Sequence, residues 1–226
     1  MKKRVDAVWD TACLAREIDA AIRSMPELTA ARFRPILRHY AKAIRGAAPR
    51  QVRDLANELI ELGFSQTHMA YALLGAHRPT LDSLNERKLK RFGRALGDWS
   101  TVDAFSLFLA GPAWRRGQIS DAVIGRWGRS RSRWWRRAAA VSTVALNRKA
   151  RGGTGDVPRT LAVCQQLAAD RDDMVVKAVS WALRDLVTHD RRAVRRFLAA
   201  HDSELAGRVK REVTCMLTTG RKNPRR

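Results

Sequence analysis

Apolar residues recur at three- and four-residue intervals along almost the whole chain, separated by short breaks of Gly, Pro, Asp and Ser. This spacing is typical of amphipathic helices, and no segment alternates as a half-buried strand does. The pattern predicts helices over residues 4–24, 29–46, 50–63, 66–77, 82–96, 100–111, 118–128, 131–149, 158–170, 173–188, 191–201 and 204–218. The predicted fold class is therefore all-α.

A weak internal repeat appears when RAAAVSTVAL, KAVSWALRDL and REVTCMLTTG are aligned. Their first residues, 137, 177 and 211, are 40 and then 34 positions apart. This spacing is typical of stacked helix pairs of the HEAT kind, in which neighbouring units cover each other's apolar faces. We expect a HEAT-like helical-repeat solenoid, an α-α superhelix with a concave basic face that binds DNA. The alternative is an irregular helical bundle.

The expected domain organisation is simple. The Gly-rich break RGGTGDVP at 151–158 is too short for a linker between domains, and Pro158 suits the first turn of the helix that follows. We therefore expect a single domain over residues 1–219, followed by a basic tail over residues 220–226.

The chain is strongly basic. Lys and Arg number 44 against 22 Asp and Glu, which gives a formal net charge of +22 and indicates a polyanionic partner such as nucleic acid. The densest basic stretch lies between Trp114 and Arg151, with Asp121 as its only acid. It contains eleven basic residues: Arg115, Arg116, Arg126, Arg129, Arg131, Arg133, Arg136, Arg137, Arg148, Lys149 and Arg151. A solvated helix face would carry compensating acids, so their absence favours phosphate binding.

Several classes of protein do not fit the sequence. No apolar run reaches the roughly 18 residues needed to span a bilayer, and we expect a cytoplasmic protein associated with the nucleoid through DNA. The cysteines Cys13, Cys164 and Cys215 are scattered through helical patterns and read as small buried hydrophobes. Phosphate-loop, dinucleotide-binding, zinc-protease and nucleophile-elbow motifs are absent, and the five histidines lack the spacing of metal ligands. We therefore expect neither a metal nor a cofactor.

The stretch GDWSTVDAF at 97–105 places a carboxylate four residues after a tryptophan, at the start of an apolar helix. A structural interpretation makes Ser100 the N-cap, with Asp103 at the third helical position and Trp99 packed on Ala104. A functional interpretation is compatible with it. A carboxylate held at a helix N-terminus beside an indole face would form a site for a cation.

Two further segments combine arginine and tryptophan. In RSRWWRRAAAV, Arg136 and Arg137 begin an apolar helix, so at least one of them has to leave the core and find an anion. In MVVKAVSWALRDL, Trp181 follows Lys177 by four positions and precedes Arg184 by three, so the three can share one helix face. Core packing is the alternative for this tryptophan.

Three fragments carry a resemblance to a known family: W-S-T-V-D at 99–103, W-W-R-R-A-A-A-V at 134–141 and K-A-V-S-W-A-L-R-D at 177–185. With AGPAWRRGQISD and RWGRSRSRWWRR they cover residues 97–200, and there the chain resembles DNA alkylation repair proteins of the AlkD type, which are helical-repeat DNA glycosylases. FRPILRHYAKAI and LANELIELGFSQTHMAYALL resemble the family's earlier helices. The chain departs from the family in lacking an acidic residue near SQTH and a glycine-containing turn before FRPILR.

The resemblance implies hydrolysis of the N-glycosidic bond of cationic alkylated purines, such as 3-methyladenine and 7-methylguanine, in duplex DNA. It also implies that the protein acts without a cofactor and without drawing the base into a deep pocket, and we expect a monomer. The residues that match the family's active-site cleft are Asp103, Trp99 and Trp181. Arg137 matches its essential arginine and Arg184 an arginine that contacts the DNA backbone. We expect Arg136 and Arg148 to bind phosphates as well.

The expected chemistry agrees with these residue types. Alkylation of a ring nitrogen makes the purine a cation and a good leaving group, so the sugar becomes an oxocarbenium-like cation without a strong general acid. Asp103 would stabilise that charge and orient the attacking water. Trp99 and Trp181 would offer indole faces or edges to the cation, worth about 0.5–2 kcal/mol each.

Two alternatives belong to other classes of protein. One is a non-catalytic helical-repeat protein that binds nucleic acid through its charge. The other is a protein-interaction solenoid, which would bind DNA weakly at about 150 mM salt. The glycosylase differs from both in depending on Asp103.

Overall fold

The protein is described by a computed structural model over residues 10–27 and 29–223, and every regular element in these ranges is helical. The expected all-α, helical-repeat fold is confirmed. The chain divides into two compact units, one ending at Ser83 and the other beginning at Leu84, and the expected single domain over 1–219 stays a prediction. Within the described ranges, no helix is long and apolar enough to cross a bilayer.

The first unit consists of short helices. They are α1 (Thr11–Arg23), α2 (Ala30–Ala43), the 3₁₀ turn η1 (Ile44–Gly46), α3 (Pro49–Leu62), α4 (Phe64–Ala76) and α5 (Arg78–Asp82). Here α3 packs on α4 and α1, and α2 packs on α4. Residues 4–9 of the first expected helix lie outside the described residues.

The second unit contains the candidate site. Its elements are α6 (Glu86–Phe92), the 3₁₀ turn η2 (Gly93–Ala95), α7 (Trp99–Phe105), the π-helical η3 (Ser106–Ala110), α8 (Gly111–Arg115), α9 (Asp121–Gly128), α10 (Arg133–Asn147), the 3₁₀ turn η4 (Lys149–Arg151), α11 (Val157–Gln166), α12 (Asp173–Leu186), α13 (Arg191–Ala200) and α14 (Gly207–Thr219). Most bounds agree with the expected ones. The expected helix at 82–96 is two elements because α5 ends at Asp82, and Asn85 then caps α6 by accepting from the Lys88 amide.

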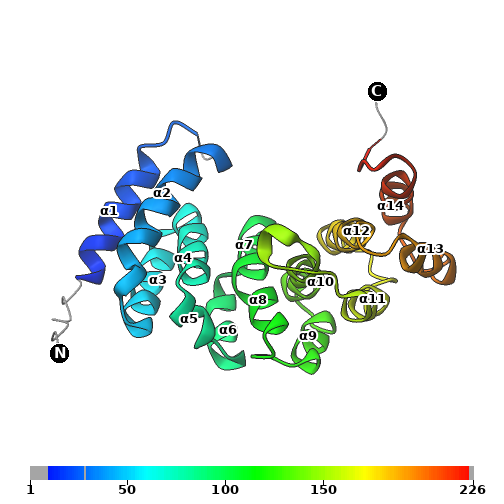
Figure 1. Cartoon of the computed structure of the whole chain (residues 1–226), viewed down its shortest axis with the longest axis horizontal. Coiled ribbons are helices and arrows are strands. Elements are labelled where there is room, and N and C mark those ends of the chain that lie inside the picture. The colour runs from blue at the N-terminus through cyan, green and yellow to red at the C-terminus, as the bar shows by residue number, and fades with distance from the viewer. Residues whose placement is uncertain (1–9, 28, 224–226) are drawn as a thin grey trace. The chain divides into compact units, whose positions relative to one another are not determined.

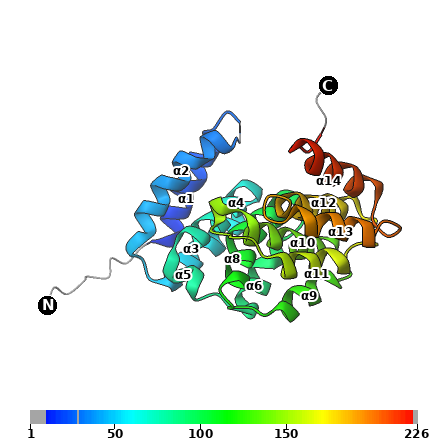
Figure 2. The same cartoon turned by 45° about the vertical axis from the view of Figure 1, so that its right-hand side comes forward.

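The three aligned segments of the sequence repeat lie on equivalent helices. They fall on α10, α12 and α14, which follow one another in a row, with α9, α11 and α13 along the other side (Figures 1 and 2). The helix α12 packs against both α10 and α14, and α9 packs against α10 and α11. Each helix pair therefore covers the apolar face of its neighbour, as the repeat predicts.

The central helix of the second unit is α10. Every residue from Arg137 to Asn147 is buried, because α7, α8, α9, α11 and α12 all pack against this helix. Its buried hydroxyls bond to the helix itself, Ser142 to the carbonyl of Ala138 and Thr143 to that of Ala140. The small side chains of AAAVSTVA allow the neighbouring helices to approach α10 closely, and the hydroxyls of Ser142 and Thr143 keep hydrogen-bond partners.

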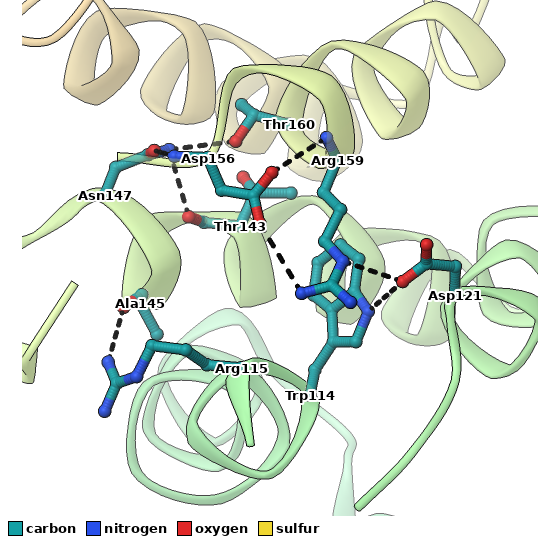
Figure 3. A network of polar contacts seen from close by, with 9 residues as sticks. All are labelled: Trp114, Arg115, Asp121, Thr143, Ala145, Asn147, Asp156, Arg159 and Thr160. Carbon is teal, nitrogen blue, oxygen red and sulfur yellow. Dashed lines mark hydrogen bonds and ion pairs between the residues drawn. The ribbon is translucent and has the colours of Figure 1, made fainter. Parts of the chain in front are cut away.

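A polar network joins four of these helices (Figure 3). The indole N–H of Trp114 and the guanidinium of Arg159 both donate to Asp121, at 2.7 and 2.8 Å. Asn147 donates to the hydroxyl of Thr160 and to the carbonyl of Thr143, and its own side-chain oxygen accepts from the Asp156 amide. The network holds α8, α9 and α11 against the C-terminal end of α10, and so fixes the backbone that follows.

The expectation of three buried cysteines is correct for Cys164 only. Burial raises the pKa of the Cys164 thiol to about 12, whereas Cys13 is exposed and Cys215 is half-buried. The helical pattern placed all three on helices, but exposure depends on which face a neighbouring helix covers.

Replacing Gly111 with Ala should destabilise the second unit. A Cβ atom there would lie 2.5 Å from the Cβ of Ala145 and 2.6 Å from the carbonyl oxygen of Ser142, so α8 would have to move away from α10. Overpacking of this kind costs about 1–3 kcal/mol, measured as the free energy of unfolding in urea. Gly207→Ala is the matched control, because a Cβ there meets nothing within 4 Å. Equal stabilities of the two variants would contradict this packing.

Candidate active site

The helix α7 begins one residue earlier than the sequence predicts. Asp98 is its N-cap and accepts hydrogen bonds from the amides of Ser100 and Thr101, at 2.7 and 3.0 Å. The expected Ser100 cap is therefore wrong, because Asp98, two positions upstream, already caps the helix and Ser100 lies within its first turn. As a result Asp103 lies in the second turn, where its carboxylate plays no part in capping α7.

The carboxylate of Asp103 faces Arg137 of α10. Both of its oxygens accept from the guanidinium, from Nε and Nη2, at 2.9 Å each. The third donor of Arg137, Nη1, bonds to the carbonyl oxygen of Met174 in the first turn of α12 at 2.5 Å. The side chains of Asp103 and Arg137 are 14% and 6% exposed, so this fork joins α7, α10 and α12 at a largely buried point.

Trp99 is exposed to solvent. Its side chain lies at the first position of α7, one helical turn before Asp103, and the residue is 56% exposed. The sequence predicts that Trp99 packs on Ala104, but such packing alone would not leave the residue so exposed. By contrast Trp114 and Trp127 are buried. An exposed indole beside a fixed carboxylate contributes little to folding and favours contact with a ligand.

Trp181 lies on the same side of α12 as the fork. It follows Met174 by seven residues, which is two helical turns and about 10 Å along the axis. The indole is half-buried, and the guanidinium carbon of Arg148 lies 5.4 Å from its ring centre. Neither Asp103, whose side chain is 14% exposed, nor Trp181 is sealed in the core, and their membership of one cleft stays a prediction.

Asp185 is a residue that the sequence interpretation missed. It follows Trp181 by four positions and accepts a hydrogen bond from Arg148 Nε at 3.2 Å. Burial raises the pKa of this carboxyl, and the charge of Arg148 and hydrogen bonds from Arg148 and Trp181 offset part of that rise. The signal was present in the sequence, since W-x-x-x-D occurs both at 99–103 and at 181–185.

An arginine contact to α12 occurs twice, once from Arg137 within α10 and once from Arg148, the C-cap of that helix. Arg137 and Arg148 each bond to a residue 37 positions further along the chain. Equal offsets mean that α10 and α12 run parallel and in register, with one arginine contact at each end. The first arginine is buried and uses three donors, while the side chain of the second is 45% exposed and donates through Nε to Asp185.

The remaining arginines that the sequence assigned to DNA also have internal partners. Arg136 bonds to Asp170 at 2.7 Å and to the carbonyl oxygens of Ser130 and Arg131. Arg184 is held by Ser180 at 3.3 Å and lies 3.8 Å from Glu212 of α14. Burial lowers the pKa of Arg184, and the charge of Glu212 opposes this shift. Both arginines hold helix ends together in the free protein.

More arginines of the basic stretch between Trp114 and Arg151 are paired with acids than the sequence indicates. Five of its arginines pair with acids that lie outside the stretch: Arg126 with Glu86, Arg133 with Asp172, Arg136 with Asp170, Arg137 with Asp103 and Arg148 with Asp185. The expectation that no acids compensate this stretch is therefore wrong, because the repeat brings acids from neighbouring helices to it. Among the described residues, Arg129, Arg131 and Lys149 are exposed and have no ion pair.

No group of three or more His, Cys, Asp or Glu side chains within the described ranges could hold a metal ion. The acids of the site are bound to arginines instead.

A comparison with protein families agrees with this arrangement. The model of the family described as DNA alkylation repair enzyme matches residues 28–214. The chain belongs to this family, and the match spans both units. No curated protein matches the chain significantly.

Asp103 and Arg137, the two members of the buried fork, should be strongly coupled in their effect on the free energy of unfolding. Arg137→Met leaves a largely buried carboxylate without its cation, and we expect a loss of about 3–5 kcal/mol in the free energy of unfolding. Asp103→Asn should also destabilise, and the double variant should lose about 2 kcal/mol less than the sum of the single variants. A double-mutant cycle measured by urea unfolding gives this coupling energy.

The matched control is Arg133 with Asp172, a pair at 3.3 Å that joins α10 to the N-cap of α12 and whose side chains are 56% and 18% exposed. Arg133→Met and Asp172→Asn should couple by less than about 1 kcal/mol, and Asn preserves the cap of α12. Equal coupling energies in the two cycles would contradict a structural role for the fork.

Proposed function

We propose that the chain is a DNA glycosylase that hydrolyses the N-glycosidic bond of cationic alkylated purines in duplex DNA. Membership of the DNA alkylation repair family supports a repair enzyme that acts on DNA. The observation that carries the finer proposal is the fixed carboxylate of Asp103, one turn from the exposed indole of Trp99. A carboxylate and an aromatic face are what a cationic nucleotide and a sugar cation require.

In the proposed reaction the C1′–N bond breaks and its electron pair moves to the purine, which leaves as a neutral base. The sugar carries the positive charge until water attacks C1′ and a proton is released to solvent. Asp103 stabilises the sugar cation and orients the water. Each of its oxygens accepts from Arg137, which fixes the direction in which the carboxylate faces.

Arg137 positions Asp103 in this proposal. Its three bonded donors leave it little freedom to clamp a phosphate in the free protein. By holding the carboxylate before the substrate arrives, the fork removes the cost of reorganising it during the reaction. Phosphate contacts by Arg137 and Arg184 stay predictions from the family resemblance, and those by Arg136 and Arg148 stay predictions from the basic stretch.

The proposal is tested by release of 7-methylguanine from a methylated duplex under single-turnover conditions. Asp103→Asn should reduce the rate by at least about 100-fold, the effect typical of removing one electrostatic stabiliser. The affinity for the duplex and its dependence on salt should remain nearly unchanged, because the phosphate contacts are kept.

A control is needed because Asp103→Asn also leaves Arg137 without its anion. The double variant Asp103→Asn, Arg137→Met restores neutrality inside the fork, and we expect it to fold, bind duplex and release no base. Binding of the duplex without any release of 7-methylguanine by the unaltered protein would favour the non-catalytic nucleic-acid-binding alternative, and an unchanged rate of release in both variants would overturn the role of Asp103. Weak binding to duplex at about 150 mM salt would favour the protein-interaction alternative.

Variants of two basic residues, Lys149 and Arg136, should separate effects on DNA binding from effects on folding. Lys149 is exposed and has no ion pair in the described part of the chain, so Lys149→Ala should weaken binding to any duplex and reduce the slope of log Kd against log salt by about 0.9. Arg136→Ala should instead lower the free energy of unfolding by about 2 kcal/mol, because Asp170 loses its partner. A change of slope in Arg136→Ala without loss of stability would contradict its internal role.

A further inference from the structure

The first unit contains a cavity in which every charged side chain of the lining is positive. Its volume is about 460 Å³, and it lies where α2 and η1 meet the C-terminal end of α4 and the start of α5. It is lined by Arg38, Lys42, Arg45, His77 and Arg78, and otherwise by alanine and proline. No carboxylate belongs to this lining, so the positive charge is not neutralised from within the cavity.

Three of the cations lie along α2 and the 3₁₀ turn that continues it. Arg38, Lys42 and Arg45 are spaced by four and then three residues, so they share one face, and all three are exposed. None of them forms an ion pair within the described ranges, whereas Arg78 pairs with Asp82 at 2.7 Å. Like charges at this spacing repel one another and contribute nothing to folding. An anion in the cavity would remove this repulsion.

The wall formed by the start of α5 adds a buried hydrogen-bond donor. His77 is 3% exposed, and its Nδ1 accepts from the amide of Thr80 at 3.3 Å. A neutral imidazole that accepts at Nδ1 carries its proton on Nε2. Burial lowers the pKa of His77, which favours this neutral form, and the backbone of Arg45 and Ala47 opposes the shift. Nε2 nevertheless has no hydrogen-bond partner in the described part of the chain.

We propose that this cavity binds a terminal phosphate or pyrophosphate group, with the three cations of α2 and η1 neutralising its charge and His77 donating to one of its oxygens. A terminal phosphate carries a charge of about −1.5 to −2 and three acceptor oxygens, so it matches several cations and one neutral donor. Buried donors seldom lack an acceptor, and a phosphate oxygen supplies one for Nε2.

The lining also indicates which part of a ligand is recognised. The volume lies within the range of about 300–1,000 Å³ that is usual for small-molecule sites. No Phe, Tyr or Trp lines the cavity, so no such side chain stacks on a base there. A phosphate inside a nucleic-acid strand carries a single charge and uses this set of cations less fully. The phosphate group at the end of a molecule is therefore the ligand that fits best.

This site does not depend on the proposed glycosylase reaction. All of its residues belong to the first unit, whereas Trp99, Asp103 and Arg137 belong to the second. The same terminal phosphate occurs on free small molecules and on the 5′-phosphorylated ends of nucleic-acid strands. The experiment therefore tests the shared chemistry first and the source afterwards.

The first probe is inorganic pyrophosphate, titrated into the full-length protein in a calorimeter at about 150 mM salt. His77→Asn should weaken its binding at least about tenfold, because a hydrogen bond to a charged group is lost. The substitution keeps the cap of α5, since His77 is the N-cap and asparagine caps helices well. A Kd weaker than about 1 mM for the unaltered protein would overturn the proposal.

Two arginines of α2 provide a matched test of the charge. Arg38 lines the cavity, whereas Arg34, one helical turn before it and also exposed, does not. Arg38→Gln should weaken pyrophosphate binding about fivefold, and Arg34→Gln should leave it unchanged. Because both side chains are exposed, these variants should fold even if His77→Asn does not. Equal losses in the two variants would mean that pyrophosphate responds only to net charge, and would overturn the proposal.

A second measurement identifies the source of the phosphate. The affinity for a short duplex with 5′-phosphorylated ends is compared with that for the same duplex ending in hydroxyls. Tighter binding of the phosphorylated duplex that is lost in Arg38→Gln supports the proposal with strand ends as the ligand. Equal binding of the two duplexes, with pyrophosphate binding intact, supports it with a small molecule. Release of 7-methylguanine is measured separately, so the phosphate site and the glycosylase proposal can fail independently.

Discussion

The second unit is organised around the ion pair between Asp103 and Arg137. It is the contact through which α7, α10 and α12 meet at one point, because the same guanidinium bonds to a carboxylate on α7 and to a backbone carbonyl on α12. A buried fork of this kind adds little net stability compared with an apolar contact, since both charges must leave water. What it supplies is geometry, because it allows only one position for the carboxylate relative to the two helices.

The helical repeat explains why this geometry occurs twice. Parallel helices in register present the same relative positions at each end, so Arg137 of α10 and Arg148 at its C-cap each find an acceptor 37 residues later, at Met174 and at Asp185. The two ends differ in burial, because α7 covers the first contact and supplies Asp103, whereas the second opens to a cavity. A repeat can therefore produce one buried and one exposed arginine from the same arrangement.

Much of the fold could be predicted because it depends on local periodicity. The helix bounds and the equivalence of α10, α12 and α14 follow from apolar spacing, and Trp99 and Asp103 share a face because they are four residues apart. The partners of the arginines could not be predicted, since they depend on which helices become neighbours. Arg136 illustrates the limit, because its acid, Asp170, lies 34 residues away and follows the end of α11.

The charge of the chain poses a physical problem that the site has to solve. A net charge of +22 attracts DNA over long range, but the same field repels a base that carries a positive charge. Pairing an arginine with an acid removes no net charge, so the surplus must lie on cations without acid partners, such as Lys149, and these act on the phosphates. At the site itself Asp103 with Arg137 and Asp185 with Arg148 are each neutral pairs. In the proposed reaction a cationic purine therefore meets a locally neutral surface beside the exposed indole of Trp99, within a basic protein.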